Sequence, residues 1–365
     1  MNIKNTKCPH CGKTINTPLN LIPYSELKKI GGDVLDSVPY DHIMIEHNNA
    51  FGGVISSDKN FKQLTFEDDD IPEILKKYIT DDNKLTYQIG SGDLDQKACP
   101  HCHFNVTPLF SNDINNVINI LLIGVTGSSK TMLASSIFKL ISEVTLKGKD
   151  EKFELATPVK SFEFEYYSEI AANFPVVPSA TYHENGFFNR QPLFYCFVNN
   201  TLLIFHDYPG EALKGSEFNV PDNSIPVYLY DYTGDVNNTE QIPFLMKKIQ
   251  ELHDGGQKYT KEVLSFVKSD LLSSQLKKSI MIKPYKETEF TNFTGLLSAR
   301  RMIQKGFKNS VFEKLREYSR IVDVNCVAAL GCPTHEVKRN GRIYYELDNT
   351  WTPEFLFDFL FTLSE

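Results

Sequence analysis

Residues 117–131 read VINILLIGVTGSSKT, and this stretch decides the fold. Its first part, Val117–Ile123, is an apolar run ending at Gly124, as expected for a strand buried on both faces of a parallel sheet. Its last residue opens a second stretch, Thr131–Val144, whose apolar residues recur at helical spacing. The sequence therefore predicts a buried strand, a tight turn of small residues and an amphipathic helix.

The turn, Gly124–Thr131, matches the pattern GxxxxGK(S/T), except that Ser129 stands in place of the second glycine. Small residues let backbone N–H groups converge on phosphate oxygens, and the N-terminus of the following helix adds partial positive charge. Lys130 would neutralise the β and γ phosphates of a nucleotide, and the Thr131 hydroxyl would bind Mg²⁺. The candidate nucleotide-binding residues of the turn are Gly124, Val125, Thr126, Gly127, Ser128, Ser129, Lys130 and Thr131.

Two points qualify this interpretation of the turn. If Ser129 adopts a positive φ, its side chain costs on the order of 1 kcal/mol, which weakens the loop without abolishing it. The alternative interpretation is an ordinary strand–turn–helix unit with a chance Lys-Thr pair.

Strands and helices alternate from residue 116 onward. We expect a hairpin turning at Asn199-Asn200, strands at Ile225–Asp231, Ser279–Pro284 and Ile321–Leu330, and helical stretches at Thr239–Leu276, 295–319 and Pro353–Leu363. This alternation predicts an α/β fold with a mostly parallel sheet and flanking helices.

A second motif, Asp207-Tyr208-Pro209-Gly210-Glu211, closes the strand that follows the hairpin turn. The hairpin and its Asp-x-x-Gly ending resemble the third motif of Ras-like and translation-factor GTPases, which are P-loop proteins. In that family the Asp holds Mg²⁺, usually through water, and the Gly amide senses the γ-phosphate. The resemblance implies these roles for Asp207 and Gly210; the alternative is a turn whose Asp caps the next helix.

Glu211 occupies the position where several of these GTPases carry a Gln that orients the attacking water. A carboxylate there would position water or act as a base, or else it only caps the following segment. In the same family a Thr of the loop before the hairpin closes on Mg²⁺ and the γ-phosphate. Thr181 is the candidate for that role and Ser179 the fallback; the alternative is a plain connecting loop.

The resemblance also implies a base-recognition motif after the strand expected at Ser279–Pro284. Guanine-specific members carry Asn/Thr-Lys-x-Asp there, but no Asp stands in register in this segment. Lys283 or Lys286 would cover the base plane, and Glu287 or Glu289 would replace the Asp. The segment Asn325–Gly331 resembles the last family motif, which contacts the base through its backbone, and this points to Ala329.

The whole region 116–365 is similar to the bacterial double-GTPase-like P-loop proteins of conflict and defence gene neighbourhoods. The residues that carry this likeness are Gly124–Thr131, Pro178–Thr181, Asp207–Glu211 and Ala328–Gly331. The resemblance implies an NTP-dependent switch that works with protein partners in a multi-component system.

Four cysteines form two Cys-Pro-His-Cys turns, with Cys8 and Cys11 in the first and Cys99 and Cys102 in the second. Two such pairs complete a tetrahedral thiolate site, and zinc is the metal that these sites hold. Because four thiolates leave no open position, the zinc would be structural; the alternative is a redox CxxC. His10, His101 and His103 are expected to be spectators; the alternative is a Cys3His site in which one of them is a ligand. We therefore expect a zinc-ribbon-like module over residues 1–113, split by an insertion, and a P-loop domain over 114–365.

Composition narrows the function classes. The net charge of −8 argues against a large nucleic-acid surface. No apolar stretch is long enough for a membrane span and no signal peptide is evident, so we expect a cytoplasmic protein, and the odd cysteine count fits a reducing compartment. The many Asn, Lys and Ile residues hint at an AT-rich bacterial genome.

Three functions remain open at this point. The first is a Mg²⁺-dependent GTPase switch, the second an ATP-using P-loop enzyme, and the third a non-hydrolysing scaffold that docks a partner through its zinc module. The sequence leaves homo-oligomerisation open.

Overall fold

The computed structural model describes most of the chain. The described residues are 6–50, 61–80, 84–87, 90–93, 95–111, 114–125, 127–143, 152–158, 161–172, 193–207, 221, 223–231, 238–254, 256, 259–268, 310–319, 322–327, 329, 334–339, 342–347 and 354–364.

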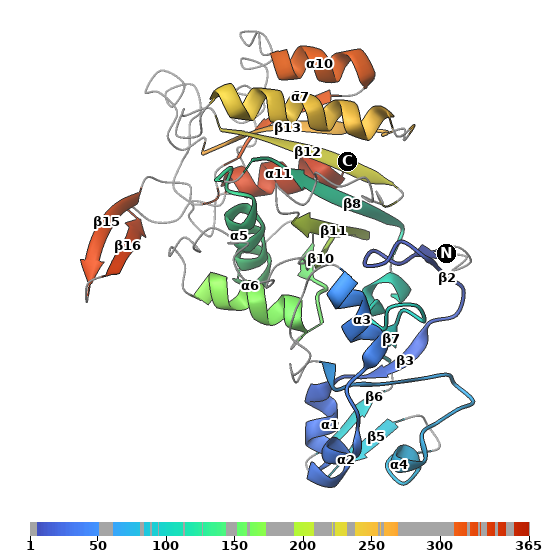
Figure 1. Ribbon diagram of the computed structural model, residues 1–365. Helices are drawn as coiled ribbons and strands as arrows, with labels where there is room; N and C mark the ends of the chain where they lie inside the picture. Colours follow the sequence, from blue (N-terminus) through green and yellow to red (C-terminus); the bar gives the residue numbers. More distant parts are fainter. Residues whose placement is uncertain are drawn as a thin grey trace.

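A sheet of seven strands forms the centre of the molecule, in the order β14-β13-β12-β8-β11-β10-β9 (Figure 1). The strands are β8 (Asn116–Ile123), β9 (Phe153–Leu155), β10 (Leu193–Val198), β11 (Thr201–Asp207), β12 (Ser224–Asp231), β13 (Glu262–Val267) and β14 (Val322–Cys326). Strands β11, β8, β12, β13 and β14 run parallel, and β10 and β9 join antiparallel at one edge. The expected mostly parallel α/β sheet is confirmed.

The central strands are buried on both faces, as their sequences indicate. Every residue of β12 is buried, and so is every residue of β8 from Ile118 onward. The hairpin between β10 and β11 turns at Asn199, which adopts the left-handed conformation (φ 54°) that Asn tolerates. The predicted hairpin is therefore present at the predicted turn.

Three helices pack on one face of the sheet. They are α5 (Lys130–Glu143), α6 (Phe162–Ala172) and α11 (Glu354–Ser364), and their apolar residues share one core with alternate residues of β8, β10, β11, β12 and β13. On the other face, α7 (Asn238–Asp254) and α10 (Ser310–Tyr318) pack only on the part formed by β8, β12, β13 and β14.

The N-terminal module covers the rest of that second face. It contains β1 (Thr6–Lys7), β2 (Thr14–Ile15), β7 (Lys97–Ala98) and a 3₁₀ helix, η2 (Thr107–Phe110). Its buried residues, among them Phe104 and Val106, form one apolar cluster with Tyr195, Leu202 and Ile204 of β10 and β11. Figure 1 shows the module beside β10 and β11, with α7 and α10 at the opposite end of the sheet.

The segment between the two cysteine pairs builds a small unit with its own core. Its elements are β3 (Leu19–Ile22), α1 (Tyr24–Ile30), α2 (Gly32–Ser37), α3 (His42–Ala50), β4 (Leu64–Phe66), α4 (Glu73–Lys76), β5 (Lys84–Tyr87) and β6 (Gly90–Asp93). Strands β4, β3 and β7 form a sheet, and Leu27, Val34, Phe66 and Leu75 are among the residues of the core.

One helical expectation is wrong. The stretch Thr239–Leu276 does not stay helical, because α7 ends at Asp254 and β13 begins at Glu262. Gly256, at φ 73°, sits in the turn where the helix has ended, and the following apolar run, Val263–Val267, is buried inside the sheet. The strand expected at Ser279–Pro284 lies outside the described residues.

A hairpin that the sequence analysis did not anticipate follows β14. It consists of β15 (Thr334–Arg339) and β16 (Arg342–Leu347), and it projects from the body of the molecule in Figure 1. The Asn340-Gly341 pair between the strands is the strongest short hairpin signal in a sequence, so this element was predictable.

Candidate functional site

The turn after β8 lies where β8 and β11 end together, while their neighbour β12 continues to Asp231. In the register of the sheet, Asp207 at the end of β11 stands opposite Leu122, and Tyr228 of β12 stands opposite Ile123. Ligands of open α/β sheets bind outside these carboxyl ends. The Gly124–Thr131 turn therefore occupies the edge where a ligand is expected.

Gly124 is required by the close packing of the turn. A Cβ atom at this position would lie 2.3 Å from Ser128 Oγ and 3.2 Å from Leu229 Cβ. The first contact is shorter than real Cβ atoms make and the second is tight, so a side chain here would displace the Ser128 hydroxyl that packs against Gly124. The first glycine of the phosphate-binding pattern therefore has a clear steric reason.

Ser129 adopts a positive φ of 62°, and Gly127 one of 82°. The condition under which Ser129 strains the loop is therefore met. The loop is nevertheless well formed: the Ser128 amide donates to Val125 O at 3.1 Å, and the Leu133 amide donates to Ser129 O at 2.8 Å, which begins α5.

Lys130 directs its ammonium group into this turn. Its Nζ donates to Gly124 O at 2.7 Å and to Val125 O at 2.9 Å, and it lies 3.5 Å from Ser128 Oγ. The residue is only 8 % exposed. A buried ammonium is costly unless it is paired, and here the carbonyl groups of the loop hold it. The positive charge is therefore fixed where the loop would wrap a phosphate chain.

The strand order and this turn decide the fold. The glycine turn follows the central strand β8 of the mostly parallel sheet, and Lys130 is held within that turn. Antiparallel strands join the sheet at one edge. The fold is that of a P-loop NTPase, with the arrangement expected for the GTPase type.

The candidate Mg²⁺ ligands are only partly described. Thr131 lies in the first turn of α5, and Asp207 is the last residue of β11, so both backbones lie at the same edge of the sheet. The candidates Thr126, Thr181, Gly210 and Glu211 fall outside the described residues, and their predicted roles stay predictions.

The strand next to β12 identifies a base-recognition candidate that the sequence analysis missed. That strand is β13, and it continues directly into Lys268-Ser269-Asp270, a Lys-x-Asp sequence. The earlier candidate Lys283 lies outside the described residues, and it follows no strand that the structure describes beside β12. The sequence signal for this site is the Lys-x-Asp triplet that follows the apolar run Val263–Val267. The helix expected over Thr239–Leu276 included that run and so concealed the signal.

Ala329 lies near this new candidate. Strand β14 pairs with β13 in parallel, and the Val327 amide donates to Phe266 O at 2.8 Å just beyond the last pair of the ladder. Ala329 follows two residues later. Its backbone is therefore near the same edge as Lys268, as the family resemblance implies.

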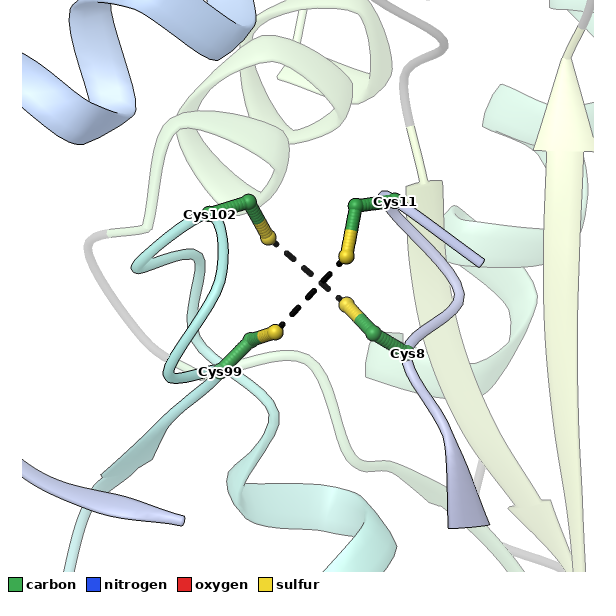
Figure 2. A group of neighbouring side chains, drawn as sticks. All are labelled: Cys8, Cys11, Cys99 and Cys102. Carbon is green, nitrogen blue, oxygen red and sulfur yellow. Dashed lines mark hydrogen bonds between the residues drawn. The ribbon is translucent and has the colours of Figure 1, made fainter. Parts of the chain in front are cut away.

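The four predicted zinc ligands converge from the two cysteine turns (Figure 2). Their sulfur atoms all lie within 4.8 Å of one another. Cys8 Sγ is 3.7 Å from Cys102 Sγ, and Cys11 Sγ is 3.7 Å from Cys99 Sγ. A tetrahedron with Zn–S bonds of about 2.3 Å has edges of about 3.8 Å. The thiol geometry therefore fits one zinc ion.

The two cysteine turns have the same local structure. The amide of Gly12 donates to Cys8 O at 2.8 Å, and the amide of His103 donates to Cys99 O at 2.9 Å. Gly12 (φ 71°) and His103 (φ 59°) both adopt the left-handed conformation directly after the second cysteine of their turn. The repeat seen in the sequence is thus a repeat of structure.

Because the four thiols lie close together, their pKa values shift in opposite directions. Hydrogen bonds from Cys102 lower the pKa of Cys11 strongly and the pKa of Cys99 to about 7. The hydrogen bond to Cys11 raises the pKa of Cys102, and burial raises the pKa of Cys8. Without a cation these thiols cannot all ionise together, and a bound metal removes that conflict.

The three neighbouring histidines have partners other than a metal. His10 stacks on Phe104 at 4.6 Å between ring centres, and its Nε2 lies 3.0 Å from the hydroxyl of Tyr195 in β10. His103 Nδ1 lies 2.8 Å from Asp41 Oδ2, and His101 Nε2 lies 3.1 Å from Thr14 O. The group of potential metal ligands found among the described residues consists of the four cysteines.

The histidine contacts join the two cysteine turns to their surroundings. Although burial opposes it, the hydrogen bond from His103 helps to lower the pKa of Asp41, and the Met44 amide and Gln63 add to this effect. Asp41 also caps the N-terminus of α3 through the Met44 amide. The second turn is therefore fixed to the inserted unit, and the first is fixed to the sheet through His10.

The sequence matches no protein-family model and no curated protein. Among solved structures, the chain is similar to the signal recognition particle receptor SRb-GTP/SRX complex from Chaetomium thermophilum, at 13% identity over 59% of this chain and 94% of that chain, with a TM-score of 0.27. It is also similar to the putative nucleolar GTP-binding protein 1 from Plasmodium falciparum, at 11% identity over 59% of this chain and 78% of that chain, with a TM-score of 0.23. These scores are too low to assign a family.

Among the helices that the structure describes, none combines the length and the apolar character needed to cross a bilayer.

Proposed function

We propose that this chain is a Mg²⁺-dependent protein that binds and hydrolyses a nucleoside triphosphate, acting as a GTPase-type switch. The observation that carries the proposal is Lys130, whose ammonium group is buried inside a tight turn at the carboxyl edge of the central strand. A charge held in that position, with the amides of a helix N-terminus beside it, suits a phosphate chain.

Each candidate residue has a distinct role in this proposal. Lys130 pairs with the β and γ phosphates, while Thr131 and Asp207 hold Mg²⁺, which neutralises charge on the phosphates. Thr181 and Gly210 respond to the γ-phosphate, and Glu211 positions the attacking water. These assignments follow from the order of the motifs along the chain and from the shared edge of β8 and β11.

Guanine is the preferred base in this proposal. A carboxylate at Asp270 would accept the N1 and N2 protons of guanine, and the stem of Lys268 would lie along the base plane. The support is the position of Lys268 directly after β13, with Ala329 of the neighbouring loop at the same edge. Lys268 and Asp270 thus replace Lys283 as the proposed base-binding residues.

The four cysteines hold a structural zinc ion in this proposal, because four thiolates fill its coordination sphere. Cytoplasmic location, protein partners, homo-oligomerisation and a role in bacterial conflict or defence remain predictions from sequence.

The test is binding of fluorescent GTP and ATP analogues in the presence of Mg²⁺, comparing the wild type with Lys130→Ala. Losing the charge-assisted contacts of one lysine should weaken GTP binding by about 10- to 100-fold. The matched control is Lys139→Ala on the same helix, where the lysine pairs with Glu143 at 2.7 Å on the surface; this variant should bind normally.

Each outcome of this experiment has a clear meaning. Equal GTP binding by the wild type and Lys130→Ala would contradict the proposal. A preference for ATP would move the chain to the ATP-using class. Binding without turnover would favour a scaffold role.

A further inference from the structure

Asp231 and Lys268 leave two adjacent parallel strands at the same edge of the sheet. Asp231 is the last residue of β12 and stands opposite Val267, the last residue of β13. Lys268 follows at once in the left-handed conformation, with φ 55°. The two side chains therefore start one residue apart in register, beside the strand that ends in the Gly124–Thr131 turn.

The side chains form an ion pair with unequal surroundings. Lys268 Nζ lies 2.8 Å from Asp231 Oδ2, and the Asp231 side chain is fully buried while that of Lys268 is 23% exposed. A buried carboxylate is stable only with a close cationic or hydrogen-bonded partner. The pair therefore has a fixed acidic end and a lysine stem that reaches the surface of the edge.

Helix α7 fixes the acidic end further. The Asp231 amide donates to Gln241 Oε1 at 2.7 Å, and Gln241 Nε2 donates to Asp231 O at 3.1 Å. Gln241 is itself buried. One side chain thus holds both the amide and the carbonyl group of Asp231, which fixes the backbone from which the carboxylate extends. We call the Asp231 carboxylate the anchor.

A lysine without an anchor samples many rotamers, because its stem has four rotatable bonds. The anchor at Asp231 confines the Nζ atom of Lys268 and so fixes the path of the apolar stem. We propose that Asp231 is a positioning residue for base recognition: it holds the stem of Lys268 where the base of a bound nucleotide stacks, without contacting the nucleotide itself. This inference rests on the proposed nucleotide-binding function and extends it to a residue outside the phosphate and base motifs.

The experiment compares two ligands that share a phosphate chain. Fluorescent GTP reports binding of both base and phosphates, and inorganic tripolyphosphate, added as a competitor, reports binding of the phosphates alone. In Asp231→Asn we expect the GTP dissociation constant to rise about tenfold, the size of one lost charge-assisted contact, with that of tripolyphosphate unchanged. General damage to the fold would weaken both ligands together.

A double-mutant cycle with Lys268→Met tests that Asp231 acts through Lys268. The double variant should bind GTP no more weakly than Lys268→Met alone, because Asp231 affects GTP binding only through Lys268. The control is Asp323→Asn, which breaks the 3.1 Å pair between Lys261 and Asp323 near the opposite ends of β13 and β14 and should leave GTP binding intact.

The outcomes separate this inference from the function on which it rests. A wild type that binds no nucleotide removes the proposed function. A wild type that binds GTP while Asp231→Asn binds it equally well, or while the two substitutions add, overturns the positioning role alone. Thermal melting of each variant identifies any that fails to fold. If Asp231→Asn fails to fold, Lys268→Met breaks the same pair from its more exposed side and should weaken binding of GTP but not of tripolyphosphate, and unchanged GTP binding would then overturn the positioning role.

Discussion

Ser129 holds a backbone conformation that favours glycine, at a position where the phosphate-binding pattern usually has one. Its φ of 62° lies in the left-handed region, where the Cβ atom crowds the following carbonyl oxygen. The presence of serine in place of the usual glycine was visible in the sequence. Its energetic cost depended only on the φ angle of Ser129. The neighbouring Gly124, by contrast, is fixed by contacts with Ser128 and Leu229.

Replacing Ser129 with Gly should therefore stabilise the protein by about 0.5–1 kcal/mol, since the relieved strain exceeds the extra entropy of the unfolded glycine. Urea unfolding of both proteins measures the difference. The control is Ser142→Gly, near the exposed end of α5, which should lose about 0.5 kcal/mol because glycine is a poor helix former. A destabilised Ser129→Gly would show that the serine side chain contributes more than its strain costs.

At the scale of single residues, sequence predicts sites whose parts are close together in the chain. Lys130 and the four cysteines belong to short patterns that specify their own turns; in the structure Lys130 donates into its turn and the four sulfur atoms lie together. Lys268 belongs to no complete pattern, because Val267 stands where the family has Asn or Thr. It became a candidate only because the strand that it follows, β13, lies beside β12 in the sheet.

At the scale of elements, β11 combines an apolar core face with one buried polar contact. His206 Nε2 lies 2.9 Å from Asn119 Oδ1 of β8, with both residues buried. Burial lowers the pKa of His206 to about 3, so the ring stays neutral in the folded protein. The contact sits one residue before Asp207 and ties β11 to the central strand near the candidate site.

This buried histidine predicts a pH dependence of stability. The unfolded chain protonates His206 below its ordinary pKa of 6.5, and the folded chain does not until about pH 3. The contribution is fully present above pH 6.5 and is lost as the pH falls toward 3, by up to about 1.4 kcal/mol per pH unit.

Urea unfolding between pH 7 and pH 4.5 measures this slope. In His206→Gln the slope should flatten, since Gln does not titrate. An unchanged slope in His206→Gln would mean that other groups dominate acid sensitivity.

Elements whose apolar residues follow one clear spacing could be predicted from sequence, and elements whose spacing fits both a helix and a strand could not. The strand β8, the hairpin β10–β11 and the helix α5 follow their patterns closely. The run Val263–Val267 is short, apolar and compatible with either a helix or a buried strand. Pairing with β12 on one side and β14 on the other selects the strand.

At the scale of the whole molecule, the cysteine module covers β10 and β11 on the sheet face whose other part is covered by α7 and α10. Its cysteines are part of the same apolar cluster as Leu193, Tyr195, Leu202 and Ile204. The sequence predicted the metal site and the sheet separately, but alternating apolar residues on β10 and β11 do not reveal what covers them. No local sequence pattern indicated that the cysteine turns and the strands β10 and β11 share one apolar cluster.

Removing zinc should therefore destabilise more than the cysteine turns. Because the two cysteine turns form part of the cover on β10 and β11, removing the proposed zinc ion with a strong chelator should cost about 4 kcal/mol or more and lower the melting temperature on the order of 10 °C. Melting curves with and without chelator, together with zinc analysis of the purified protein, measure this effect.

The matched variants are Cys8→Ser and Cys196→Ala. Cys8→Ser should melt low with or without chelator, whereas Cys196→Ala, at a buried thiol outside the cluster, should keep the full response to chelator. A chelator-insensitive wild type that contains no zinc would contradict the metal assignment.

The same arrangement has a consequence for how the chain is made. The first cysteine turn leaves the ribosome well before Cys99 and Cys102, and earlier still than the strands that its cover buries, which end at Asp207. At about 5–20 residues per second, some 10–40 s pass between synthesis of Cys11 and completion of β11. During that interval the apolar residues of the cysteine module lack the strands β10 and β11 on which they pack, so this surface stays exposed until β11 is complete.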